Sequence, residues 1–195
     1  MRILGIDPGL GGAFALIDGD DEFGLDTLVI LDMPLLPAGS ARRRPKKADK
    51  QILSEASCAQ IVQLLKPDIA IIERVGAMPG QGIASAFNFG VSFGILRGVL
   101  ASNAVPYRLV TPREWKKYFR LRTDKGAART IASRLYPSYA NLFVRAKDHG
   151  RAEAALIAHY AKSCFFAVTE PTKPPKLIAA TLTRQVVGPN TPLAV

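Results

Sequence analysis

Four carboxylates and one histidine stand at positions where they could bind divalent metal ions. Asp7 and Glu73 each end a short apolar run, and an alanine-rich segment later in the chain opens with Asp148, His149 and Glu153. A charge at the end of a buried strand is costly unless something compensates it, and one divalent cation compensates two or more carboxylates. Two hard cations about 4 Å apart can activate a water and stabilise the leaving oxygen when a phosphodiester is hydrolysed. We therefore predict one catalytic site made of these five residues, whose metal ligands are Asp7, Glu73, Asp148 and Glu153.

Each of these acids also has an ordinary structural explanation. Asp7 could stabilise the turn that follows it, and Asp148 could cap a helix. Glu73 could form an ion pair with Arg74 or Arg97. The combination of two strand-end acids with two acids around one helix start favours a shared site over separate structural roles.

The elements that must position these acids alternate between strands and helices. The continuous apolar run over 68–73 predicts a strand buried on both faces, whereas the apolar spacing over 52–65 predicts a helix that ends before Pro67. The predicted strands cover 3–6, 13–17, 27–33, 68–73 and 105–111, and the predicted helices cover 52–65, 83–103, 112–119, 123–137 and 148–166. This order predicts an α/β fold with a mixed central sheet. If the strands that end at Asp7 and Glu73 are parallel neighbours, their carboxylates emerge at the same edge of the sheet.

The composition restricts the class of the protein and its partners. The 195 residues suffice for one domain with a buried core, and 48% hydrophobic residues argue against a disordered chain. The formal net charge of +10 favours a polyanion as the partner, nucleic acid above all. No uninterrupted apolar run has the length of a membrane span and the N-terminus does not resemble a signal peptide, so we expect a cytoplasmic protein without a membrane partner. Cys58 and Cys164 lack metal-type spacing, and we expect them to be core residues.

Basic side chains that could contact phosphates are concentrated in one segment and recur along the chain. Residues 37–50, "PAGSARRRPKKADK", have no apolar periodicity and carry six basic residues against one acid. We predict a basic loop there, which is either merely solvated or binds phosphates. The predicted DNA contacts are Arg42, Arg43, Arg44, Lys46, Lys47, Arg74, Lys116, Lys117, Arg122, Lys125 and Arg129.

A stripe of glycines runs along the predicted helix over 83–103. Gly90, Gly94 and Gly98 recur every four residues and therefore share one face, although glycine lowers helix propensity. Close packing explains such a stripe. The packing partner is either the protein's own sheet or a second copy of the chain.

Three stretches, "ILGIDPGLGGAFALID", "IAIIERV" and "DHGRAEAALIAHY", resemble the catalytic motifs of RuvC-type Holliday junction resolvases. "GIDPG" is the most specific of these motifs, and "TPREWK" after a strand resembles phage relatives. The resemblance covers residues 1–165 in order. It implies an RNase H-like nuclease domain over 1–168, with a mixed sheet of about five strands and helices on both of its faces. We expect the proline-punctuated residues 169–195 to form an irregular tail.

The resemblance assigns three of the family's acids and leaves one position open. The first, second and last acids fall on Asp7, Glu73 and Glu153, the last being Asp in most members. The third acid, three residues before the last, falls on Gly150. We expect Asp148 to replace it, because a residue outside the helix is not bound by helical spacing. His149, one helical turn before the last acid, is the alternative.

The resemblance also implies an activity. Members of the family are crossover junction endodeoxyribonucleases, which act as homodimers in DNA recombination and repair and leave 5′-phosphate and 3′-hydroxyl ends. By resemblance we expect two Mg²⁺ or Mn²⁺ ions per site and branched DNA, especially four-way junctions, as the substrate. The cell would be bacterial, with or without an infecting phage. Met78, in the glycine-rich loop after Glu73, either packs ordinarily or inserts into the junction.

Three other readings fit parts of the sequence. A strand, an aspartate and a glycine-rich turn also open sugar kinases and actin-like ATPases, but those chains are usually about twice as long. The protein could also be a non-catalytic DNA-binding member with a decayed metal site, since Gly150 replaces an acid. A phage endonuclease that cuts branched DNA in general would use the same chemistry on a broader substrate.

Overall fold

The fold was analysed in a computed structural model, which describes residues 1–19, 26–37, 51–74, 76, 80, 82–121 and 126–165. Several predictions fall outside the described residues: the phosphate contacts Arg42, Arg43, Arg44, Lys46, Lys47, Arg122 and Lys125, the inserted Met78, and the tail over 169–195.

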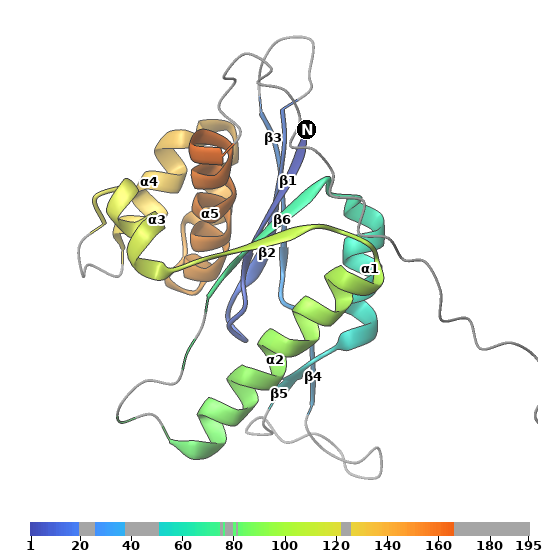
Figure 1. Cartoon of the computed structure of the whole chain (residues 1–195). Helices are drawn as coiled ribbons and strands as arrows, with labels where there is room; N and C mark the ends of the chain where they lie inside the picture. Colours follow the sequence, from blue (N-terminus) through green and yellow to red (C-terminus); the bar gives the residue numbers. More distant parts are fainter. Residues whose placement is uncertain are drawn as a thin grey trace, which may run out of the picture.

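Five strands form one mixed sheet in the order β3-β2-β1-β6-β7 (Figure 1). The strands are β1 (Arg2–Asp7), β2 (Ala13–Asp18), β3 (Thr27–Asp32), β6 (Ile69–Glu73) and β7 (Tyr107–Val110). The first three pair antiparallel, while β6 pairs parallel with both β1 and β7. The predicted mixed sheet of about five strands is therefore confirmed.

Helices cover both faces of this sheet (Figure 1), as predicted. One face carries α1 (Glu55–Leu65) and α2 (Ile83–Ser102), and the other carries α3 (Pro112–Tyr118), α4 (Ala127–Leu135) and α5 (His149–Phe165). Two 3-10 helices, η1 (Pro137–Phe143) and η2 (Ala146–Asp148), connect α4 to α5. A separate two-stranded ribbon consists of β4 (Leu35–Pro37) and β5 (Gln51–Leu53).

Helix α1 begins later than the sequence predicted. Residues 51–53, which continue the helical pattern in sequence, pair with β4 instead. Ser54 then starts the helix, because its side-chain oxygen accepts a hydrogen bond from the Ser57 amide at 3.3 Å. A cap and a strand partner thus override the apolar periodicity at this end.

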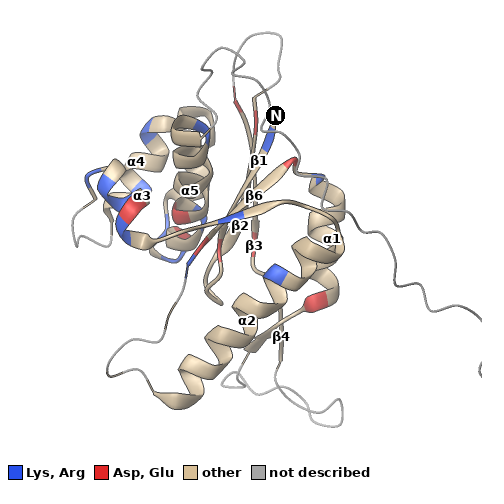
Figure 2. Cartoon of the chain, in the orientation of Figure 1, with Lys and Arg blue, Asp and Glu red and all other residues tan. Residues whose placement is uncertain are grey.

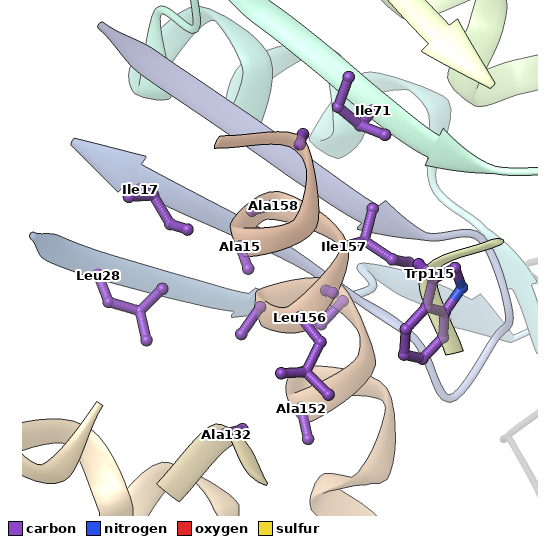
Figure 3. Close-up of a cluster of buried hydrophobic side chains, with 14 of the residues drawn as sticks. Ala15, Ile17, Leu28, Ile71, Trp115, Ala132, Ala152, Leu156, Ile157 and Ala158 are labelled. Carbon is purple, nitrogen blue, oxygen red and sulfur yellow. The ribbon is translucent and has the colours of Figure 1, made fainter. Parts of the chain in front are cut away.

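The alternation of side chains along β1 decides what faces α5. Leu4 and Ile6 join the core under α1 and α2, while Ile3 joins the core under α5. Gly5 lies on the α5 side, where an added Cβ would come within 2.2 Å of the Ala154 carbonyl oxygen. This contact and the row of small side chains on α5 (Figure 3) let the helix pack directly on the strand. By the same alternation, the last residue of β1 points toward α5.

Helix α2 is only partly covered. Its C-terminal half contributes Leu96, Val99 and Leu100 to the core, whereas its N-terminal half extends past the sheet (Figure 1). A Cβ added at Gly90, Gly94 or Gly98 would meet no atom within 4 Å, so these glycines do not pack on the protein's own sheet. Among the described residues, α2 is the one helix whose length and composition alone would permit a membrane span, and 22% of that stretch is buried in the protein.

Candidate metal centre

Three carboxylates converge between the sheet and α5. Asp7 and Glu73 end the parallel neighbours β1 and β6, each one residue beyond the paired Ile6 and Ile72. Glu153 reaches the same place from the second turn of α5. One oxygen from each carboxylate lies within 4.8 Å of the others, and the three residues are only 7–9% exposed. This acidic cluster (Asp7, Glu73, Glu153) brings together three of the four predicted metal ligands.

Each carboxylate of the acidic cluster has a polar neighbour that orients it. The Gly9 amide donates to Asp7 Oδ1 at 3.2 Å, and the Trp115 indole N–H donates to Glu73 Oε1 at 2.9 Å. Lys116 Nζ lies 2.9 Å from Glu153 Oε1. These contacts fix one oxygen of each carboxylate, so the three groups are held in place by the fold.

Burial and mutual repulsion make the acidic cluster unfavourable on its own. Desolvation, followed by the charge of Glu153, raises the pKa of Asp7 to about 6. Desolvation also raises the pKa of Glu73 to about 7, although the hydrogen bond from Trp115 lowers it in part. A hard divalent cation removes this cost, because it prefers carboxylate oxygens and supplies the missing positive charge. The donor set therefore fits Mg²⁺ or Mn²⁺.

A pH-dependent stability follows from the raised pKa of Glu73. Without metal, the wild type loses stability as the pH rises from about 4.5 to about 7, because the Glu73 carboxyl loses its proton at a lower pH in the unfolded chain than in the folded protein. Glu73→Gln has no such proton, so by about pH 8 it should exceed the wild type in free energy of unfolding by about 3 kcal/mol. Denaturant titrations in EDTA and in Mg²⁺ measure this, and Mg²⁺ should reverse the order. A constant difference between the two proteins across this pH range would contradict the burial argument.

The structure does not bring Asp148, a predicted metal ligand, into the acidic cluster. Its side chain is 2% exposed, and both of its oxygens accept hydrogen bonds from Arg145. It ends η2 rather than capping α5. The alternative, His149, lies at the acidic cluster: its Nε2 is 3.3 Å from Glu153 Oε1. The buried Nδ1 of His149 has no hydrogen-bond partner among the described residues.

At the position where the resemblance would place a third acid, backbone leaves no room for a side chain. A Cβ at Gly150 would lie 2.1 Å from the Gly11 carbonyl oxygen and 2.6 Å from the Gly12 Cα. The turn after β1 therefore packs directly on the first turn of α5. No side chain fits at this position unless the turn or the helix moves.

The predicted basic residues have different surroundings. Lys116 lies at the acidic cluster, and Arg129 donates to the Val144 carbonyl at 2.8 Å. Arg74 and Lys117 are exposed, and basic side chains recur on α3 and α4 beside α5 (Figure 2).

The sequence reasoning missed Trp115 altogether. It lies in "TPREWK", where the Thr111–Glu114 capping box starts α3 and leaves the indole on the buried side. Figure 3 shows it beside Ile157 of α5. The signal available in the sequence was a single apolar residue at a helix start that otherwise carries charged residues, which indicates that this side chain is buried.

The sheet order and its helical covering define an RNase H-like fold. Within this class the chain is similar to RuvC from Thermus thermophilus, with a TM-score of 0.53, 14% identity, and coverage of 84% of this chain and 96% of that one. The same RuvC in complex with its Holliday junction substrate matches with a TM-score of 0.53 over 97% of its chain. The yeast mitochondrial Holliday junction resolvase Ydc2 matches with a TM-score of 0.48 and 15% identity, over 86% of this chain and 84% of that one.

No protein-family model and no curated protein sequence matches the chain. The resemblance to RuvC-type resolvases is thus confirmed for the fold, at low sequence identity.

Proposed function

We propose that this protein is a metal-dependent crossover junction endodeoxyribonuclease that resolves four-way DNA junctions. The observation that carries the proposal is the convergence of Asp7, Glu73 and Glu153 at the ends of parallel strands in a RuvC-like fold. RuvC has been seen with a Holliday junction, which supports the same substrate class here. The products are 5′-phosphate and 3′-hydroxyl ends, formed during DNA recombination or repair in the cytoplasm of a bacterial or phage-infected cell.

The acidic cluster would hold two Mg²⁺ or Mn²⁺ ions, which supply an activated water and stabilise the charge on the leaving oxygen. The protein's own groups prepare this site. Trp115 and the Gly9 amide fix the orientation of Glu73 and Asp7, so little reorganisation is needed. Lys116 neutralises Glu153, and its flexible amine can contact the scissile phosphate once cations take over that charge.

We assign His149, rather than Asp148, as the fourth protein group of this site. His149→Ala should lower the rate of junction cutting by about 10- to 100-fold with little loss of stability, because this side chain is half-exposed beside Glu153. Asp148→Asn should instead lower the free energy of unfolding by about 2 kcal/mol, because it weakens the bonds to Arg145. Single-turnover cutting and denaturant titration on both variants separate the roles. Cutting lost only in Asp148→Asn would reinstate Asp148 as the ligand.

The proposed DNA contacts and dimer draw on separate surfaces. Lys116 of α3 lies at the acidic cluster, and further basic side chains on α3 and α4 suit contacts to phosphates (Figure 2). The glycine face of α2 (Gly90, Gly94, Gly98) is open, and it is flanked by Ile83 and Phe87, which are 91% and 70% exposed. A second copy of the chain would cover these apolar side chains, and a homodimer would supply one site for each cut strand.

A cutting assay tests the proposal directly. A synthetic four-way junction and a linear duplex of the same sequence are incubated with the protein in Mg²⁺ or Mn²⁺. Paired nicks in the junction, an intact duplex and no cutting in EDTA are expected. Equal cutting of flapped DNA would broaden the substrate to branched DNA, while ATP binding without any cutting would favour the kinase-like reading.

A further inference from the structure

Helix α5 is tied to β3, an outer strand of the five-stranded sheet, by an ion pair near each of its ends. Near the start of the helix, Arg151 Nε and Nη2 donate to the two carboxylate oxygens of Asp32, the last residue of β3. Near its end, Lys162 pairs with Asp26, which directly precedes β3. The second pair lies about 13 Å along the helix from Glu153. Only the first pair is therefore close to the acidic cluster.

Arg151 has a second carboxylate partner in Asp148. Its Nη1 lies 3.7 Å from Asp148 Oδ1, and the same carboxylate accepts hydrogen bonds from Arg145. The side chain of Arg151 is 22% exposed and that of Asp148 only 2%, so this pair is screened less by water than an ordinary surface pair. One guanidinium thus connects the residue that precedes α5 to the residue that ends β3. We call Arg151, Asp32 and Asp148 the arginine clamp.

The arginine clamp and the acidic cluster lie on different sides of α5. Across the sheet, Asp7 of β1 pairs with Ala13 of β2, which pairs in turn with Asp32 of β3. Asp7 and Asp32 are therefore two strands apart on the same face of the sheet. Arg151 precedes Glu153 by two positions, which places their side chains about 200° apart around the helix. Any effect of Arg151 on the acidic cluster must therefore pass through the position of α5.

The other contact that holds the start of α5 is made by backbone alone. Gly150 packs against the turn after β1, and the Met33 amide joins that turn to the end of β3 by donating to the Gly12 carbonyl at 3.1 Å. A contact between glycines limits how closely the helix approaches the turn, but it does not stop the helix from sliding along it. The two directed hydrogen bonds from Arg151 supply this sideways restraint.

We propose that the arginine clamp positions Glu153 for metal binding and thereby sets the affinity of the acidic cluster for divalent cations. Without a cation, the charges of Glu153 and Asp7 repel each other, which favours movement of α5 away from β1. The clamp opposes this movement and keeps the carboxylate oxygens within 4.8 Å of one another. Arg151 is thus a positioning residue. The inference rests on the proposed function, because it requires the acidic cluster to bind metal.

Binding of Mn²⁺ to the metal-free protein in the absence of DNA tests this role, with the free ion measured by electron paramagnetic resonance. Arg151→Gln should weaken Mn²⁺ binding about 10-fold, the low end of what loss of a supporting contact costs a metal site. The Mg²⁺ concentration for half-maximal junction cutting should rise by the same factor. The cutting rate at saturating Mg²⁺ should stay within about twofold of the wild type, because the clamp does not touch the reacting atoms. A lower rate at saturating Mg²⁺ with unchanged Mn²⁺ affinity would overturn the inference.

Lys162→Gln is the matched control, because it breaks the other ion pair between the same helix and the same strand. It should lower the melting temperature in EDTA about as much as Arg151→Gln does, yet leave the Mn²⁺ affinity within about twofold of the wild type. Arg151→Lys keeps the charge but loses the forked donor, so it should recover only part of the lost affinity. An equal loss of Mn²⁺ affinity in Lys162→Gln would reduce the clamp to a structural contact and overturn the inference.

Asp32→Asn keeps the test decisive if Arg151→Gln folds poorly. The side chain of Asp32 is 59% exposed, so this variant should fold normally. It should weaken Mn²⁺ binding by about 3-fold or more, and it should add no further loss to Arg151→Gln, because the two residues act as a pair. Wild-type affinity in both single variants would overturn the inference alone. A wild type that binds no Mn²⁺ would overturn the proposed function as well.

Discussion

Asp7→Asn should lower the rate of junction cutting by about 10³-fold and leave junction binding intact. The substitution keeps the shape of the side chain and removes one charge from the acidic cluster. A metal ion contributes several kcal/mol of charge stabilisation in the transition state, and that stabilisation requires charged ligands. Binding is expected to depend mainly on phosphate contacts elsewhere, and fluorescence anisotropy in EDTA measures it. The loss should therefore appear in the chemical step alone.

The stability of this variant distinguishes a catalytic role from a structural one. Because burial raises the pKa of Asp7 to about 6, the neutral asparagine should not destabilise the protein near neutral pH without metal. Asp18→Asn is the matched control: it removes an acid at the other end of the same sheet, where Asp18 pairs with Arg2. Cutting by this control should stay within about twofold of the wild type. An Asp7→Asn protein that cuts normally in Mg²⁺ would remove the acidic cluster from the mechanism.

The convergence of Asp7 and Glu73 could be predicted because it depends on backbone geometry. Two apolar runs that end in acids predict buried strands, and parallel neighbours bring their carboxyl ends to one edge. The acid on α5 was found from the alanine-rich helix that follows it. Patterns of this kind can be recognised in the sequence without knowledge of side-chain positions, since they depend only on periodicity and on the order of the strands and helices.

The remaining features of the site depend on contacts between side chains that are distant in the sequence, or on which of several nearby side chains form a contact. Trp115 reaches Glu73 across 42 positions of the sequence, and its role follows from how α3 docks beside α5. Asp148 was predicted as a ligand because it is an acid near the helix start. Arg145 donates hydrogen bonds to both carboxylate oxygens of Asp148, and nothing in the residue pattern indicated this pairing. The different surroundings of two adjacent residues, Asp148 and His149, thus became visible only in the side-chain geometry.

Gly150→Asp, which places an acid where the family has its third one, should destroy the site rather than complete it. The added Cβ would come within 2.1 Å of the Gly11 carbonyl oxygen, and both sides of this contact are backbone. Overpacking of this kind and burial of a further charge together should cost about 3 kcal/mol or more in free energy of unfolding. Thermal melting should show a loss of about 6–12 °C for a chain of this size. Cutting should fall as well, since the displaced turn carries the amide that orients Asp7.

Two glycine variants separate steric conflict from charge. Gly150→Ala adds only the methyl group and should still lose most of the stability that Gly150→Asp loses, because the clash begins at Cβ. Gly11→Ala changes the other side of the same contact, where a Cβ would meet nothing within 4 Å, and it should melt within about 2 °C of the wild type. A Gly150→Asp protein that melts normally and cuts faster would mean that the turn yields and an acid fits beside Glu153. The close approach of the turn to α5 therefore gives a steric reason why this chain has a glycine at this position, and it leaves His149 as the side chain beside Glu153.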